Sequence, residues 1–193
     1  GRGRDGYAIA LDSEALMVRR FSEHPAELAQ LAGARMVVSS EIEDGQKFAE
    51  ARLKQLTGGD PISARFMRSN PFTFIPSHTL WLVGNHRPNA NAGGDALWRR
   101  IKLIPFSHIV PEESRDSRLE EKLMGEAPQI LAWLAQGAAD YHANGLRPPA
   151  AVVEATGTYR ADQDSVGKFI AERCMLTPAG QVKVAELRAA YEA

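Results

Sequence analysis

Two short apolar stretches of this chain are each followed by a polar residue, and this arrangement restricts the fold. Met36-Val37-Val38 is followed by two serines and Glu41, and Thr79–Val83 is followed by a glycine and Asn85. Short apolar runs are typical of strands in a parallel sheet, where both faces are covered. Such sheets bind ligands at the carboxyl ends of their strands, so the pattern predicts an α/β fold with Glu41 and Asn85 at that edge.

Further elements are expected around these two strands. The apolar spacing predicts helices over 25–31 and 45–56, the second capped by Asp44, and a hairpin of strands 62–67 and 72–75. A short helix capped by Asp95 and a strand over 101–106 should follow. Residues 1–22 contain only a short apolar patch and resemble the cut edge of a longer chain.

The sequence after residue 111 has the apolar spacing of helices, and a polar segment within it indicates a boundary between two domains. The segment 162–165 is a polar joint, and two short helices are expected after it. We therefore predict a first domain over residues 1–161, with a helical tail, and the start of a small second unit over residues 162–193. Two helices joined by a turn fit a helix-turn-helix, although the pattern is common in helical domains.

The charge of the chain is unevenly distributed. Between residues 61 and 110 there are six basic residues and one acidic residue, a net charge of about +5, whereas the whole chain carries −1. A basic segment favours contact with nucleic acid. The chain has a single cysteine, Cys174, which excludes an internal disulfide and favours a cytoplasmic location. The sequence contains no long uncharged apolar run of the kind that spans a membrane.

Glu41 is the first candidate for catalysis. A carboxylate at the end of a buried strand can hold a Mg²⁺-bound water or orient the water that attacks a terminal phosphate. Glu43 and Asp44 are close enough in the sequence to share this role. The alternative is a surface acid at the start of the next helix, where negative charge is favourable.

Asn85 and an arginine pair are further candidates for phosphate chemistry. The amide of Asn85 could orient water or contact a γ-phosphate, or the residue could simply form a turn. Arg99 or Arg100 could reach the nucleotide of a neighbouring subunit as an arginine finger. Because adjacent side chains point in different directions, at most one of the two serves as the finger, and a surface ion pair is the alternative for both.

The predicted hairpin carries basic and aromatic residues. Arg65 and Arg68, with Lys54 nearby in sequence, could neutralise the backbone of single-stranded DNA. The aromatic residues of the hairpin offer a stacking surface but fit the hairpin core equally well. They are Phe66, Phe72 and Phe74.

One expected part of a nucleotide site is missing from the sequence. No stretch matches the phosphate-binding loop G-x-x-x-x-G-K-[ST]. The nearest match ends in Gly167-Lys168, but Asp162 replaces its first glycine and Phe169 replaces its serine or threonine. Without the lysine and the backbone donors of such a loop, affinity for nucleotide should be weak.

Four stretches, taken in order, resemble one protein family. These stretches are residues 31–41, 54–62, 80–88 and 96–101. They are similar to the C-terminal helicase part of phage and plasmid primase-helicases, the poxvirus-like branch of superfamily 3 helicases within the AAA+ class. The resemblance runs from about Asp5 to the end of the chain. It implies an AAA+-like parallel-sheet ATPase core that lacks its Walker A loop and ends in a helical tail, followed over residues 162–193 by the start of a winged-helix-like DNA-binding domain.

The resemblance also implies roles for the candidate residues. Glu41 takes the Walker B position, where it would hold Mg²⁺ through water, and Asn85 takes the sensor position. Arg100, or alternatively Arg99, takes the position of the arginine finger. Arg65 and Arg68 fall on the DNA-contacting hairpin. Family members form rings, usually hexamers, that hydrolyse ATP between subunits and move one DNA strand through the centre.

Three hypotheses follow from the sequence. The first is a fragment of an ATP-driven replicative DNA helicase, inactive by itself because the Walker A loop is missing. The second is a non-enzymatic DNA-binding module that uses the basic hairpin and the terminal helices. The third, a metabolic α/β enzyme, lacks support because the five histidines are scattered singly.

Overall fold

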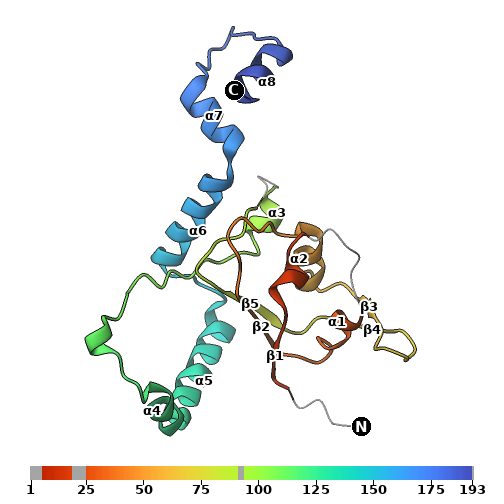
Figure 1. Cartoon of the computed structure of the whole chain (residues 1–193), viewed down its shortest axis with the longest axis vertical. Helices are drawn as coiled ribbons and strands as arrows, with labels where there is room; N and C mark the ends of the chain where they lie inside the picture. The colour runs from red at the N-terminus through yellow and green to blue at the C-terminus, as the bar shows by residue number, and fades with distance from the viewer. Residues whose placement is uncertain (1–5, 19–24, 91–93, 193) are drawn as a thin grey trace. The chain divides into compact units, whose positions relative to one another are not determined.

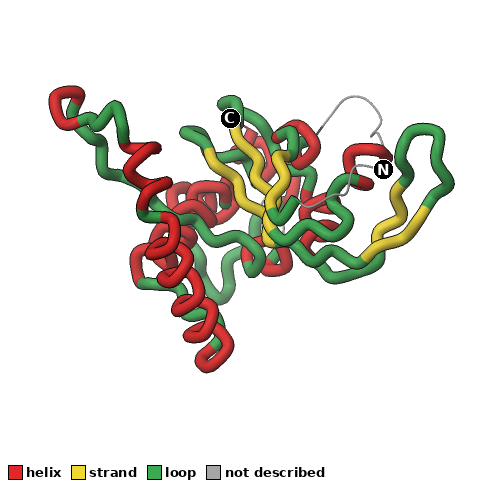
Figure 2. The backbone as a smooth tube through the Cα atoms, turned by 90° about the horizontal axis from the view of Figure 1, so that it is seen from below, coloured by secondary structure: helices red, strands yellow, loops and turns green. Residues whose placement is uncertain are grey.

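A computed structural model describes residues 6–18, 25–90 and 94–192, and it contains a small parallel sheet (Figure 1; Figure 2). The three strands are β1 (Ala8–Ala10), β2 (Met36–Ser40) and β5 (Thr79–Val83). Their order is β1-β2-β5, and both pairings are parallel. β2 is therefore the central strand, and β5 is an edge strand within the described part of the chain.

The two strands predicted beside Glu41 and Asn85 are confirmed. β2 continues two residues beyond Val38, and its side chains at Val37 and Ser39 are fully buried. β1 is not predicted by the sequence. Its backbone pairs with β2 from Ala8 opposite Met36, so this three-residue strand depends on a tertiary partner rather than on local propensity.

The helix predicted over 45–56 begins later than expected. α2 covers Glu50–Thr57, and Asp44 does not cap it. Gly45 has a φ of +75°, which no right-handed helix contains. The backbone N–H groups of the next residues donate to other segments instead of to a helix: Phe48 N–H donates to Asn89 O, and Ala49 N–H donates to Leu16 O.

Two other short helices lie near the sheet in sequence. α1 covers Pro25–Ala29, as predicted for the start of that helix. α3 covers Asp95–Trp98, but Gly94 occupies the N-cap position and no side chain caps the helix. The expected cap by Asp95 is therefore wrong: its carboxylate pairs with Arg160 at 2.6 Å instead.

The predicted hairpin is confirmed, with shorter strands than expected. β3 (Ile62–Ala64) and β4 (Phe72–Phe74) pair antiparallel, and residues 65–71 connect them. Figure 2 shows this two-stranded ribbon extending away from the parallel sheet. Ile62 and Ala64 are buried, whereas the phenylalanines opposite them are half-buried.

Residues 102–159 form a separate compact unit, and residues up to 101 belong with residues 160–193 in the other. The strand expected over 101–106 is wrong, because this segment has no regular structure. The N–H of Leu103 donates to the hydroxyl of Thr156 at 2.9 Å instead of to a strand. Four helices lie partly or wholly in this unit: η2 (Glu112–Ser114), α4 (Leu119–Gly125), α5 (Ala127–Asn144) and most of α6 (Ala150–Gln163).

The two helices expected at the end of the chain are confirmed. α7 covers Ser165–Arg173 and α8 covers Val184–Glu192. Asp164 caps α7 by accepting a hydrogen bond from Gly167 N, and the rings of Phe169 and Tyr191 join the helices edge to face at 5.3 Å. No helix in the described residues is both long and apolar enough to cross a membrane. The proposed domain boundary at 161/162 stays a prediction.

Candidate functional site

The carboxyl ends of β2 and β5 form one edge of the sheet. The two strands pair in register up to Ser40 opposite Val83. Glu41 and the Gly84–Asn85 pair therefore follow adjacent strands at the same edge, as parallel pairing requires. The chain brings together two polar residues that are more than forty positions apart in the sequence.

Glu41 has a backbone conformation that is uncommon for a residue other than glycine. Its φ is +63°, in the left-handed region that costs about 1–3 kcal/mol for most residues and is concentrated at functional sites. Its carbonyl accepts a hydrogen bond from the hydroxyl of Ser13 at 3.1 Å. The carboxylate itself is exposed and has no partner among the described residues.

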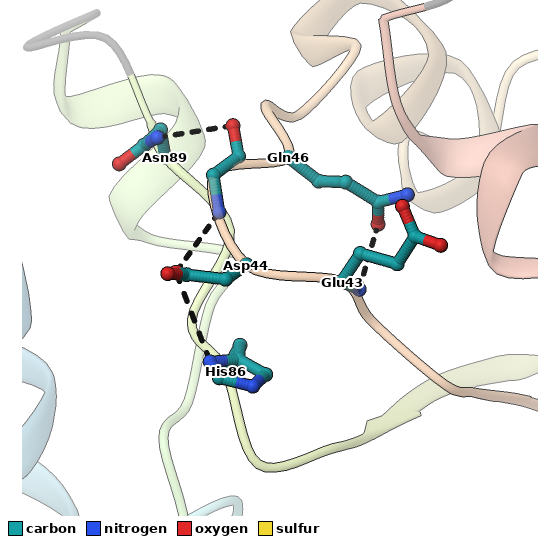
Figure 3. A network of polar contacts seen from close by, with 6 residues as sticks. Glu43, Asp44, Gln46, His86 and Asn89 are labelled. Atoms are coloured by element: carbon teal, nitrogen blue, oxygen red, sulfur yellow. Dashed lines mark hydrogen bonds and ion pairs between the residues drawn. The ribbon is translucent and has the colours of Figure 1, made fainter.

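Hydrogen bonds and a close contact between a histidine and a carboxylate join the loop after β2 to the loop after β5 (Figure 3). Asp44 Oδ1 lies 3.7 Å from His86 Nδ1 and also accepts a hydrogen bond from Gly45 N at 2.9 Å. The Asn89 side chain donates to Gly45 O at 3.3 Å, and Asn89 N donates to Gln46 O at 2.6 Å. The two loops are therefore held at a fixed separation.

Packing between these loops is also close. Ile42 is 6% exposed, and a Cβ added to Gly84 would lie 3.3 Å from its side chain. A glycine at position 84 thus lets the loop after β5 approach Ile42, which directly follows Glu41 in the sequence. A side chain at this position would press on Ile42, which would have to shift by a few tenths of an ångström.

Two further candidates at this edge have free side chains. Asn85 is exposed, and its amide has no hydrogen-bond partner among the described residues. Glu43 is also exposed, and its backbone N–H donates to Gln46 Oε1 at 3.3 Å, which fixes the backbone and leaves the carboxylate available. The loops after β2 and β5 therefore carry two carboxylates and one amide without partners among the described residues.

The arginine pair lies at the end of α3, apart in sequence from the loops described above. Arg99 is the C-cap residue of this helix, and Arg100 follows it; both are exposed. The guanidinium of Arg100 donates to Ala96 O at 2.5 Å, so it folds back on its own helix. Among the described residues no contact joins Arg100 to Glu41 or Asn85, and its role stays a prediction.

The three residues predicted to contact DNA lie on two elements. Lys54 is on α2 and pairs with Glu50 at 3.6 Å. Arg65 and Arg68 are exposed in the hairpin connection, and Arg68 has a φ of +59°. A turn forms here, because Ser69 N donates to Phe66 O at 3.1 Å. Arg68 therefore occupies a turn position that normally favours glycine or asparagine.

The aromatic rings of the hairpin contact one another. Phe66 and Phe72 stack with ring centroids 5.5 Å apart, and Phe74 lies 6.1 Å from Phe72. All three are half-buried. This arrangement supports a role in the hairpin core, while Met67, at 81% exposure, is the apolar side chain nearest the turn that faces solvent.

Sequence reasoning missed the residues that connect the two loops. By sequence, His86 is one of five scattered histidines and Asn89 has no assigned role, and Ser13 lies in a segment with no expected element. A signal exists for one of them, because His86 directly follows Asn85 in a loop already assigned to the site. The contact of Ser13 with Glu41 spans 28 residues and has no local signal.

Comparison with known proteins gives three distant relatives, and no family model matches the chain. A protein of Acanthamoeba polyphaga mimivirus, named "Putative helicase L207/L206", is 28% identical over 84% of this chain. Proteins of Frog virus 3 and Invertebrate iridescent virus 6 bear the same description with the designations 022R and 184R. They are 23% and 25% identical over 89% and 73% of this chain.

This chain spans about a fifth of the length of these relatives, because the matches cover 19%, 20% and 18% of them. The chain is thus similar to proteins of large DNA viruses that are named as helicases. Its fold, a small parallel sheet with helices, is compatible with a nucleotide-binding core.

Proposed function

We propose that this chain is part of an ATP-dependent replicative DNA helicase of superfamily 3, in the primase-helicase branch of the AAA+ class. The observation that carries this proposal is the shared edge of β2 and β5, where Glu41 and Asn85 follow paired strands. Similarity to viral proteins named as helicases supports the same activity. The fold alone would not support helicase activity, because open α/β sheets serve many functions.

The residues at this edge fit the terminal phosphate side of Mg²⁺–ATP. Magnesium is usually held by one or two carboxylates, water and the phosphates of the substrate rather than by a cage of side chains. The described residues contain no cluster of three or more potential metal ligands, and they offer free carboxylates at Glu41 and Glu43. Bound Mg²⁺ would neutralise phosphate charge during hydrolysis.

Each candidate side chain has a separate task in this proposal. Glu41 holds a magnesium-bound water or orients the attacking water, and its unpartnered carboxylate is available to accept a proton. Asn85 orients the same water or contacts the γ-phosphate without adding negative charge. The bonds between the two loops limit the movement of one loop against the other, which supports an aligned attack.

A neighbouring subunit supplies the positive charge in this proposal. Arg100, with Arg99 as the alternative, would extend to the nucleotide of the next subunit of a ring, usually a hexamer in the family. The bond from Arg100 to Ala96 O is then exchanged for one to phosphate. An arginine in this role contributes by stabilising charge in the transition state.

DNA binding is assigned to the hairpin and α2. Arg65 and Arg68 neutralise phosphates of a single strand, and Lys54 adds a third charge once its ion pair with Glu50 exchanges for phosphate. The left-handed backbone of Arg68 supports this assignment, because strained residues are enriched at binding sites.

A segment that precedes this chain supplies the phosphate-binding loop in the proposal. Its strand would pair with the open edge of β5, where Trp81 and Val83 are exposed. The relatives are about five times as long as this chain, which leaves ample sequence for such a segment. The 193 residues alone should therefore hydrolyse little or no ATP.

Substitution of Glu41 tests the proposed function. In the protein that carries this chain together with the preceding segment, Glu41→Gln should lower ATP turnover by at least about 100-fold, because the carboxylate is replaced by an amide of the same shape. Binding of nucleotide should change little. The measurement is steady-state ATP hydrolysis with and without single-stranded DNA, with Glu154→Gln on α6 as the matched control. Undiminished turnover in Glu41→Gln would remove the proposed role.

The exposed, strained hairpin also favours the second candidate, a DNA-binding module without enzymatic activity. In that case DNA affinity would depend on salt but not on ATP, and the protein with its preceding segment would not hydrolyse ATP. Fluorescence anisotropy of labelled single-stranded DNA, with and without Mg²⁺–ATP, separates the two functions. A helicase should show a nucleotide-dependent change in affinity.

A further inference from the structure

Ser13 contacts the residue on which the proposed function depends. Its hydroxyl donates to the carbonyl of Glu41 at 3.1 Å. The Ser13 side chain is 7% exposed, so water competes little for this hydrogen bond. The donor comes from η1 (Ser13–Leu16), an element that follows β1.

The position of Ser13 is itself fixed by neighbouring contacts. Asp12 accepts a hydrogen bond from Glu14 N at 2.9 Å and so caps η1. Just before it, Leu11 N donates to Val38 O at 2.8 Å, which continues the pairing of β1 with β2. Residues 11–14 are therefore anchored to the sheet next to the end of β2.

The same segment also holds the far end of the loop that Glu41 begins. Val18 N donates to Lys47 O at 2.8 Å, and Ala49 N donates to Leu16 O at 2.9 Å. The loop 41–49 is thus bonded along one side to residues 11–18 and along the other to the loop after β5. In such a frame a left-handed residue can persist, because its surroundings determine its backbone conformation.

We propose that Ser13 is a positioning residue for the carboxylate of Glu41. The hydroxyl fixes the carbonyl, and hence the peptide plane, of a residue whose left-handed backbone would relax without it. The direction of the Glu41 side chain follows from that backbone. This inference rests on the proposed function, in which the carboxylate acts on water or on Mg²⁺-bound water.

A control exists at the amino ends of the same two strands, β2 and β5. The hydroxyl of Ser77 donates to the carbonyl of Ala34 at 3.0 Å, and both residues precede strands rather than follow them. This bond also joins a serine hydroxyl to a backbone carbonyl, but Ser77 is exposed and its bond lies away from Glu41. Ser77→Ala therefore reports the general effect of losing such a bond.

The experiment compares Ser13→Ala, Ser13→Thr and Ser77→Ala in the protein that includes the preceding segment. ATP hydrolysis is measured as kcat and KM, with Glu41→Gln as the reference, and melting is measured for every variant. We expect Ser13→Ala to lower kcat about tenfold or more with little change in KM, since small misplacements of a catalytic group have effects of this size. Ser13→Thr should restore most of kcat. Ser77→Ala should keep normal kcat and lose no more stability than Ser13→Ala, because Ser77 is exposed.

The outcomes separate this inference from the proposed function. Normal kcat in Ser13→Ala, in a protein that Glu41→Gln inactivates, overturns the inference and leaves the function intact. An equal loss of kcat in Ser77→Ala also overturns it. If Ser13→Ala does not melt cooperatively, Ser13→Cys, which keeps the size but donates weakly, is measured in its place.

A second readout does not require ATP hydrolysis. In the 193-residue chain, Ser13→Ala should speed amide hydrogen exchange in loop 41–49 at least about tenfold, whereas Ser77→Ala should not. If the longer protein proves inactive, the proposed function fails, and the exchange rates alone decide whether Ser13 fixes this loop. Unchanged exchange in Ser13→Ala would count against the inference.

Discussion

Arg68 shows how a single residue can combine backbone strain with a binding role. Replacing Arg68 by glycine relieves a left-handed backbone, which should stabilise the protein by about 1 kcal/mol. The same change loosens the unfolded chain, which should destabilise it by about 0.4–1 kcal/mol. Because these effects oppose each other, we expect the free energy of unfolding of Arg68→Gly to change by less than about 1 kcal/mol.

The affinity of Arg68→Gly for single-stranded DNA should nevertheless fall. Loss of one phosphate contact should also reduce the slope of log affinity against log salt by about 0.7. Anisotropy titrations at several salt concentrations measure both quantities, and Arg68→Lys, which keeps the charge, serves as the control. If Arg68→Gly binds with unaltered affinity and slope, the hairpin turn does not contact DNA.

His78 is a second residue with a measurable consequence. Both ring nitrogens are buried and have no hydrogen-bond partner among the described residues, and burial lowers the pKa of His78 below its ordinary value of 6.5. The unfolded chain therefore binds a proton at His78 more readily than the folded protein does. The stability that neutral His78 provides is present above about pH 6.5 and is lost as the pH falls through its lower, folded pKa.

Urea unfolding between about pH 7.5 and about pH 5.5 tests this expectation. The protein should lose stability over this range, and His78→Leu should lose less, because its side chain cannot take up a proton. The other four histidines are common to both proteins, so the difference reports His78. Equal pH dependence in the two proteins would contradict the prediction.

At the level of the elements, the loops after β2 and β5 act as a bonded pair, and Gly84 sets their separation. In Gly84→Val the new side chain would press on Ile42, with its Cβ only 3.3 Å away. We expect destabilisation of about 1–3 kcal/mol from overpacking. Gly137→Ala, in α5 where an added methyl meets no neighbour, should instead stabilise by up to about 1 kcal/mol.

Chemical denaturation measures the change in free energy of unfolding for Gly84→Val and for Gly137→Ala, and so shows whether each variant is less or more stable. In the protein with its preceding segment, Gly84→Val should also lower ATP turnover, because Glu41 and Asn85 would move apart. A Gly84→Val variant with unaltered stability would show that the two loops do not pack closely in solution.

The elements also show how far sequence reasoning reaches. Local apolar runs are sufficient to predict β2, β5 and the hairpin, since short runs of apolar and β-branched residues favour strands. Strand β1 is missed and a strand over 101–106 is wrongly expected, because pairing depends on a partner far away in the sequence. For the same reason the edge shared by Glu41 and Asn85 is predictable from parallel strands, whereas the contacts of Ser13 and His86 are not.

On the scale of the whole molecule, the two compact units differ in how much they bury. Val37 and Ser39 in β2 are fully buried, whereas α5 has no buried residue. Local opening is easiest where few apolar contacts are lost. Although both elements have regular backbone hydrogen bonds, amides of β2 should exchange with solvent much more slowly than those of α5.

Hydrogen exchange followed by mass spectrometry checks this difference in a single experiment. We expect protection of β2 to approach the global free energy of unfolding and protection of α5 to be lower by several kcal/mol, or roughly 100-fold or more in rate. Gly137→Ala should raise protection in α5 only. Similar protection of the two elements would mean that α5 is covered by contacts absent from the described residues.

The open side of β5 has a practical consequence for anyone who prepares this chain by itself. A strand that ends a sheet displays amide and carbonyl groups ready to pair with another copy, and here Trp81 and Val83 add apolar surface. The 193-residue chain by itself should therefore tend to aggregate by pairing of this strand with the same strand of another copy. Lysine at position 83 would introduce a charge that discourages such pairing and would make the chain easier to concentrate.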